Sequence, residues 1–191
     1  MLNLAIVVGS VRKGRQTHKA AYFLEKKLKQ ISDVNVKLID LQEYNIPIFE
    51  ESFGSHTNPT ESLKQAAEIL DNADAIILQS PEYHASMSGV LKNFMDYFTK
   101  EISRKPIGVV TASSGKFGGL NASSQMQQLI FGVASYPMPF KFIVPFISNA
   151  IDDNFDAMNE EVNKSGEKFI NEFLWFANAL TNAKSASKAA A

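Results

Sequence analysis

Leu2-Asn3-Leu4-Ala5-Ile6-Val7-Val8-Gly9-Ser10-Val11-Arg12-Lys13-Gly14-Arg15-Gln16-Thr17 is the stretch that decides the fold of this 191-residue chain. It passes from a nearly continuous apolar run into a polar loop with two glycines, two arginines and two hydroxyls. Short apolar runs without alternation are typical of strands covered on both faces, as in a parallel sheet. The stretch therefore predicts a buried strand whose carboxyl end carries a polar loop.

Strands and helices are predicted to alternate through the rest of the chain. Further β-branched runs occur at residues 34–40, 75–80, 106–111 and 140–145. Leu24, Leu28 and Ile31 repeat at helical spacing, and the same pattern predicts helices at about residues 60–72, 88–99, 120–133 and 159–180. This alternation predicts a three-layer α/β fold, with a five-stranded parallel sheet of order 2-1-3-4-5 and helices on both faces.

One domain is expected over residues 1–180. Residues 181–191 consist mainly of Ala, Ser and Lys without apolar periodicity, and they are predicted to be a frayed or disordered tail. The N-terminus has no basic lead and the chain has no apolar window long enough to span a membrane, so a soluble, cytoplasmic protein is expected.

Composition restricts the chemistry. The chain has no cysteine, which excludes disulfides, iron–sulfur clusters and thiol catalysis, so redox chemistry would need a bound cofactor. A net charge of -1 gives no field that would attract nucleic acid or an anionic membrane. The three histidines have no spacing that suits a shared metal site, so no metal is expected. The partner is predicted to be a small molecule.

Ligands of such sheets bind outside the carboxyl ends of the strands, which directs attention to residues 9–16, 81–87 and 112–119. The first of these loops has the residue types of a phosphate cradle, because glycine permits close approach, hydroxyls donate and arginine offers a planar fork. A polar turn that merely caps a helix is the alternative, although capping needs neither arginine. The loop is neither a P-loop nor a Rossmann fingerprint, which favours a mononucleotide such as FMN over ATP. The predicted phosphate-binding residues are Gly9, Ser10, Arg12, Arg15, Gln16 and Thr17.

The second loop carries a family resemblance. Its sequence Pro-Glu-Tyr-x-x-Ser-x-x-Gly-x-Leu-Lys-Asn begins at Pro81, and together with Gly-Ser-x-Arg after the first strand it resembles the NADPH-dependent FMN reductases, which include azoreductases and quinone or chromate reductases. The resemblance covers about residues 4–133. It implies that this loop lies along the isoalloxazine edge and contacts it through the backbone. The implied residues are Pro81, Glu82, Tyr83 and His84.

Two positions of this loop depart from the usual family pattern. His84 stands where the family usually has Asn, and Ser88 stands where it usually has Pro. A backbone contact at His84 would survive this change, whereas a contact from an Asn side chain would not.

The third loop is rich in glycine and serine. Backbone amides aimed at N1 and O2 would stabilise reduced FMN, and glycines would allow the chain to lie flat on the ring. A plain flexible turn is the alternative. The predicted residues are Ser113, Ser114, Gly115, Gly118 and Gly119.

The resemblance implies a flavodoxin-like fold and an NAD(P)H-dependent FMN reductase. NADPH or NADH would reduce FMN, which would pass two electrons to a quinone, azo compound or similar small acceptor. No catalytic side chain is expected, because the flavin carries the chemistry. The family usually forms homodimers or homotetramers, and Phe49, Phe53 and Tyr97 are candidates for an apolar interface.

Two alternatives lack NAD(P)H turnover. One is a flavodoxin-type electron carrier, although such carriers tend to be strongly acidic and hold phosphate with Thr and Ser rather than arginine. The other is a flavin-binding regulatory module on the same fold.

Overall fold

The structure, a computed structural model, describes residues 1–189 and contains one parallel sheet. The strand order β2-β1-β3-β4-β5 agrees with the predicted order 2-1-3-4-5. The four long strands fall within one residue of the predicted ranges, because three are nearly continuous apolar runs that end at polar loops and β2 alternates apolar with polar residues. They are β1 (Leu2–Val8), β2 (Val34–Asp40), β3 (Ala75–Pro81) and β4 (Pro106–Ala112).

The fifth strand differs from the prediction of one strand at residues 140–145. Two short pieces pair with β4, β5 (Tyr136–Pro137) and β6 (Phe142–Val144). The N–H of Met138 still donates to the carbonyl of Ile107 (2.9 Å), but the next residue is Pro139, which has no N–H to donate. Proline is tolerated at the edge of a sheet, and here it interrupts the ladder.

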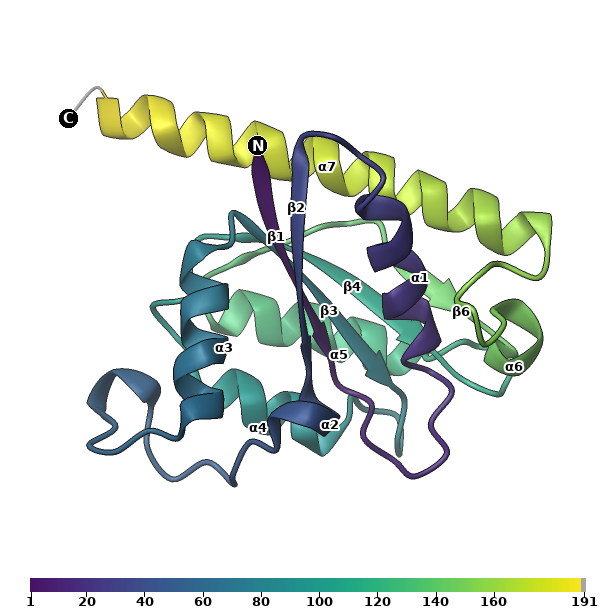
Figure 1. Cartoon of the computed structure of the whole chain (residues 1–191), viewed down its shortest axis with the longest axis horizontal. Coiled ribbons are helices and arrows are strands. Elements are labelled where there is room, and N and C mark those ends of the chain that lie inside the picture. Colours follow the sequence, from purple (N-terminus) through teal and green to yellow (C-terminus); the bar gives the residue numbers. More distant parts are fainter. Residues whose placement is uncertain (190–191) are drawn as a thin grey trace.

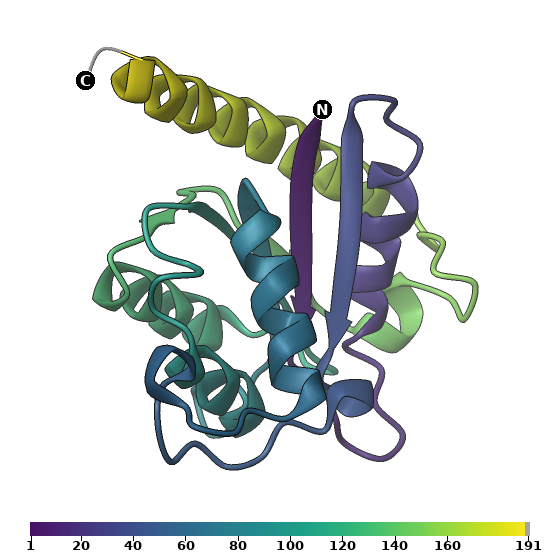
Figure 2. The same ribbon diagram turned by 60° about the vertical axis from the view of Figure 1, so that its left-hand side comes forward.

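Helices cover both faces of the sheet (Figures 1 and 2). One face packs against α1 (Lys19–Leu28), α6 (Ile147–Ala150) and α7 (Glu160–Ala189). The other packs against α3 (Glu61–Asn72), α4 (Gly89–Tyr97) and α5 (Leu120–Gly132). The chain also forms α2 (Leu41–Tyr44) and a 3-10 turn at Phe53–Ser55. None of the helices within residues 1–189 combines the length and apolar character needed to cross a membrane.

Helix α7 continues beyond residue 180, where the sequence pattern predicts its end. The structure describes residues 181–189 as helix, while residues 190–191 of the predicted tail lie outside the described part. Whether this end frays in solution stays a prediction.

Helix α4 places its apolar residues inward, as their spacing predicts. Leu91, Phe94 and Phe98 have no exposed surface. Tyr97 is also buried and its hydroxyl donates to the carbonyl of Ile48 (3.0 Å), so this residue is not available for a surface contact.

Candidate functional site

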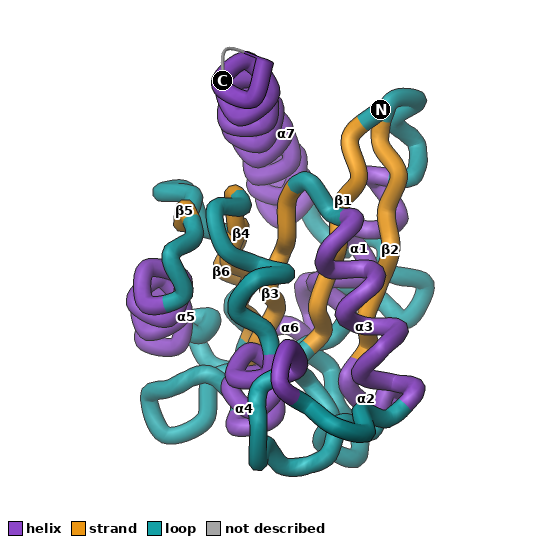
Figure 3. The backbone as a smooth tube through the Cα atoms, turned by 90° about the vertical axis from the view of Figure 1, so that its left-hand side faces the viewer, coloured by secondary structure: helices purple, strands orange, loops and turns teal. Residues whose placement is uncertain are grey.

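A polar cavity of about 280 Å³ opens at the carboxyl ends of β1, β3 and β4. Figure 3 shows loops gathered at this end of the sheet, opposite the N-terminus. All three predicted loops contribute to the cavity, and so does α6. The lining residues are Ser10, Arg12, Arg15, Gln16, Thr17, Pro81, Glu82, Tyr83, Ala112, Ser113, Ser114, Ile147 and Ser148.

A second hollow of about 380 Å³ adjoins this cavity and shares Arg12 and Tyr83 with it. Its other lining residues are mainly apolar or glycine: Gly9, Val11, Ser88, Gly89 and Val90. The two hollows therefore offer a polar end and an apolar end that meet at Arg12 and Tyr83. A ligand with an anionic tail and a flat apolar body would match both ends.

The first loop leaves several donors free at the polar end. The N–H of Arg15 bonds the carbonyl of Arg12 (2.9 Å) and closes a turn, with Gly14 at φ 70°. The backbone N–H groups of Gln16 and Thr17 donate no hydrogen bond to any of residues 1–189. Arg12 is exposed and has no ion-pair partner in the same part of the chain. These donors precede α1, whose N-terminus also favours an anion.

Ser10 is almost fully buried, yet it lines the cavity. Its hydroxyl accepts a hydrogen bond from the Thr17 hydroxyl (2.7 Å), which connects the two ends of the first loop. This bond therefore helps to hold the shape of the loop.

Arg15 lines the cavity but already has partners. It donates two hydrogen bonds of 2.6 Å to the carboxylate of Asp40, and a third of 2.6 Å to the carbonyl of Ser10. Burial alone would raise the pKa of Asp40, but hydrogen bonds from Arg15, Gln42 and Tyr22 outweigh it and hold the pKa below its usual value. The Arg15 guanidinium, which the sequence analysis assigns to phosphate, is thus bound to a carboxylate in this structure.

The second loop forms a tight turn at its tip. Tyr83 and Ser86 exchange two backbone hydrogen bonds (2.9 and 3.0 Å), and both residues between them have positive φ, His84 at 50° and Ala85 at 60°. Such turns favour Asn and Gly, which gives a backbone reason for the Asn usual at the position of His84. The His84 side chain is exposed and does not line either hollow.

Side chains of the second loop hold neighbouring elements. The Glu82 carboxylate accepts from the N–H of Ala122 (3.0 Å) and from the Asn121 side chain (3.2 Å) at the start of α5, so it fastens the second loop to that helix. Ser88 donates to the carbonyl of Gly9 (2.6 Å) and accepts from the N–H of Leu91 (3.3 Å). The departure from proline at Ser88 therefore adds a bond between the first and second loops.

The Cβ positions of two glycines of the third loop, Gly118 and Gly119, are occupied by neighbouring protein atoms, and the expectation that their backbone lies flat against a ring stays a prediction. A Cβ at Gly118 would lie 2.9 Å from the backbone nitrogen of Pro145, and one at Gly119 would lie 2.8 Å from Cβ of Thr111. Both residues have positive φ, 60° and 93°. Glycine is needed at both positions because a side chain there would overlap β4 or the turn after β6. Gly115 has open space beside it but does not line the cavity.

Helix α6 supplies a wall that the sequence analysis missed. Ile147 donates to the carbonyl of Ser113 (3.0 Å), and the N–H of Ser113 bonds Val144 (3.1 Å), so the third loop is fastened to this segment. Ser148 lines the cavity. The available signal was a polar Ser-Asn pair at residues 148–149, just after the last predicted strand.

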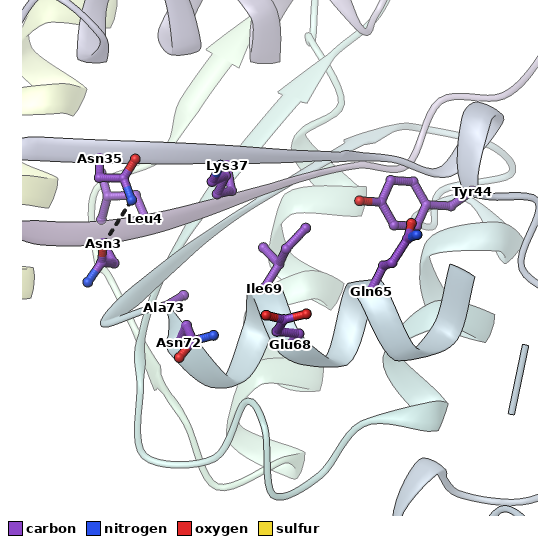
Figure 4. Close-up of a pocket in the computed structure, with 10 residues that line it drawn as sticks. All are labelled: Asn3, Leu4, Asn35, Lys37, Tyr44, Gln65, Glu68, Ile69, Asn72 and Ala73. Atoms are coloured by element: carbon purple, nitrogen blue, oxygen red, sulfur yellow. Dashed lines mark hydrogen bonds between the residues drawn. The ribbon is translucent and has the colours of Figure 1, made fainter. Parts of the chain in front are cut away.

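Another hollow, of about 420 Å³, lies between α3 and the adjoining face of β1 and β2 (Figure 4). The strands supply one wall of this hollow, where the Asn35 side chain donates to that of Asn3 (3.0 Å) and Lys37 follows on β2. The opposite wall includes Glu68 and Ile69 of α3. None of the predicted site residues lines it. We place the functional site at the loop cavity, because ligands of doubly wound sheets bind at the carboxyl ends of the strands.

The fold and the loop cavity together define a flavodoxin-like α/β protein whose adjoining hollows suit an anionic, partly apolar ligand. The profile of the NADPH-dependent FMN reductases matches residues 2–148, and the chain belongs to this family.

Similar proteins include two named reductases and one solved flavoenzyme. The FMN-dependent NADPH-azoreductase of Staphylococcus saprophyticus is 28% identical over 182 residues, which cover 90% of this chain and 93% of the relative. A quinone reductase of Pseudomonas putida is 28% identical over 178 residues, covering 90% and 92%. The fold matches FerB, a flavoenzyme NAD(P)H:(acceptor) oxidoreductase of Paracoccus denitrificans, with a TM-score of 0.81 at 22% identity over 94% of this chain and 98% of that one.

These findings confirm the predicted flavodoxin-like fold, the family, the FMN cofactor and the class of NAD(P)H-dependent oxidoreductase. They favour the enzyme over the electron carrier and the regulatory module.

Proposed function

We propose that this protein passes two electrons from NADPH or NADH through FMN to a quinone, azo compound or similar small acceptor. The observation that carries the proposal is the pair of adjoining hollows, one polar with free donors and one apolar. FMN, when bound, supplies the redox chemistry by accepting hydride from the nicotinamide and yielding two electrons to the acceptor.

The chain's own residues bind and orient the cofactor in this proposal. A phosphate is suited by the Arg12 guanidinium, the Ser10 hydroxyl and the free N–H groups of the first loop, because charged and oriented donors favour a dianion. Tyr83 and Ser113 belong to loops that would bound the ribityl chain and the ring. No acid or base is needed for hydride transfer.

The acceptor class rests on the relatives. The Staphylococcus saprophyticus protein is named for azo reduction and the Pseudomonas putida protein for quinone reduction. Both acceptor types are flat and conjugated, which suits stacking on the ring of FMN bound in the apolar hollow beside Tyr83 and Val90.

A homodimer or homotetramer located in the cytoplasm is part of the proposal. Exposed apolar side chains of the second and third loops, among them Tyr83 (39% exposed) and Phe117 (65%), suit a subunit interface better than Tyr97, which is buried. Light scattering after size-exclusion chromatography measures the assembly.

The deciding experiment is a visible absorption spectrum of the purified protein reconstituted with FMN, followed by anaerobic addition of NADPH and then of a quinone. We expect a bound flavin spectrum that bleaches with NADPH and returns with the quinone. Steady NADPH consumption separates the enzyme from an electron carrier or a regulatory module. A protein that cannot be reconstituted with FMN would contradict the proposal.

A further inference from the structure

A buried ionic network lies behind the wall of the loop cavity. Its centre is Asp40, at the end of β2, whose side chain has no exposed surface. Four hydrogen bonds converge on this carboxylate. The donors are Arg15 Nη1 and Nη2 (2.6 Å each), the Tyr22 hydroxyl (2.8 Å) and the backbone N–H of Gln42 (3.0 Å).

The network connects separate parts of the chain. Tyr22 belongs to α1, Gln42 to α2 and Arg15 to the first loop, so one carboxylate holds three segments at the end of β2. Arg15 extends the connection to Ser10 through its bond to the Ser10 carbonyl (2.6 Å). The first loop is thereby fixed at both of its ends.

The network also determines which of the two arginines of the first loop keeps an unpaired positive charge. The bidentate geometry pairs Arg15 with a full negative charge that is shielded from solvent, so the two charges largely cancel. Arg12 keeps its charge at the cavity, with no ion-pair partner among residues 1–189. Two arginines of one loop thus have different electrostatic roles.

We propose that Asp40 and Arg15 are positioning residues of the phosphate-binding loop. The pair holds residues 10–17 in the shape that presents the Ser10, Gln16 and Thr17 donors, and Arg15 acts through Asp40 and the Ser10 carbonyl rather than as a ligand of the phosphate. This inference rests on the proposed FMN site.

A direct ligand and a positioning residue respond oppositely to loss of the Asp40 charge. If Arg15 were a phosphate ligand, Asp40→Asn would free its fork, and FMN affinity would stay or rise. If the pair positions the loop, both Asp40→Asn and Arg15→Gln loosen it and weaken FMN. Because the two residues then act as one unit, the double variant should be no worse than either single variant.

The experiment measures dissociation constants of FMN and riboflavin by flavin fluorescence for wild type, Asp40→Asn, Arg15→Gln and the double variant. We expect each variant to weaken FMN by about tenfold, equivalent to about 1.4 kcal/mol, and riboflavin by less than about twofold. The selectivity for FMN over riboflavin is the readout that a general loss of stability would not change. Lys64→Gln, which removes a surface ion pair with Glu61 on α3, is the control and should leave both constants unchanged.

A second measurement does not depend on flavin. Hydrogen exchange in the ligand-free protein should become faster at residues 10–17 in Asp40→Asn and Arg15→Gln, and unchanged in Lys64→Gln. Should Asp40→Asn fail to fold, Arg15→Lys keeps the charge but loses the bidentate fork, and Tyr22→Phe removes one bond from the carboxylate. Both should show the same selective loss, smaller in Tyr22→Phe.

Unchanged or tighter FMN binding in Asp40→Asn would overturn the inference. Additive losses of FMN binding free energy in the double variant would overturn it too, as would unchanged hydrogen exchange at residues 10–17. A wild-type protein that binds no FMN would instead end the proposed function, and loop exchange would still decide the positioning role. The two failures are therefore distinguishable.

Discussion

At the scale of single residues, Arg12 is the cation on which the phosphate assignment depends. Arg12→Ala should weaken FMN by about 1.5–3 kcal/mol, the range for hydrogen bonds to charged groups, and leave riboflavin unchanged because riboflavin has no phosphate. Fluorescence titration with both flavins measures this. Lys13→Ala removes a neighbouring charge that does not line the cavity and serves as the control. Equal losses for both flavins would make Arg12 structural.

Gly118 and Gly119 should be required by the fold rather than by the ligand. Gly118→Ala and Gly119→Ala combine positive φ with a Cβ that meets backbone or side-chain atoms within 3 Å. Each should cost about 2–4 kcal/mol in the free energy of unfolding, from backbone strain and overpacking together. Gly115→Ala has open space and should cost much less. Urea unfolding of the three variants checks the order, and equal stabilities would refute it.

His84 should act through its backbone, because its side chain is exposed at the tip of the Tyr83–Ser86 turn. His84→Asn should keep stoichiometric FMN and most of the NADPH oxidation rate, and Asn suits the positive φ of 50° better than His. The measurement is kcat/KM with one quinone across about pH 5 to about 9, and we expect profiles of the same shape. A titration that is present in wild type and absent in the variant would assign the imidazole a function.

At the scale of elements, a loop at residues 151–158 is fastened to α1. Phe155 stacks on Tyr22 at 4.8 Å, Asp153 pairs with Lys19 at 2.7 Å, and Asp156 pairs with Lys26 at 2.6 Å. His18, just before α1, packs edge-on against Tyr22 and Phe155. This contact encloses the imidazole beside the positive end of the helix.

The enclosure gives stability a defined pH dependence. Burial, and then the positive charge of Arg15, lower the pKa of His18 to about 4. Since the folded-state pKa lies below the unfolded value of about 6.5, the contribution is complete above pH 6.5 and is lost as pH falls towards 4. Urea unfolding at several pH values should show a steeper loss in wild type than in His18→Gln across this window. Parallel curves would show that the imidazole is not enclosed in solution.

For the whole molecule, the sequence predicts the elements, and which loops lie together, better than it predicts side-chain directions. Apolar runs such as Leu2–Val8 mark buried strands, and parallel strands bring their loops to one edge whatever the loops contain. The spacing of Arg15 and Asp40, 25 residues apart, carries no sign of their pairing, because only the β1–β2 register brings them together. In the same way, the glycines at 118 and 119 mark close approach without showing that the neighbour is a strand. What approaches a residue is set by tertiary packing, which local pattern does not contain.

The predicted domain boundary at residue 180 can be tested by truncation. Among residues 160–187 of α7, the last fully buried side chain is Ala177, Leu180 is partly buried, and residues 182–187 are exposed. Deleting residues 181–191 should therefore change the free energy of unfolding by no more than about 0.5 kcal/mol, as for surface substitutions, and leave FMN affinity unchanged. Phe173→Ala is the contrasting variant, because it empties a buried site on the same helix and should cost about 3–5 kcal/mol. Thermal and urea unfolding with FMN titration measure both. A truncated protein that loses as much stability as Phe173→Ala would place the end of the domain beyond residue 180.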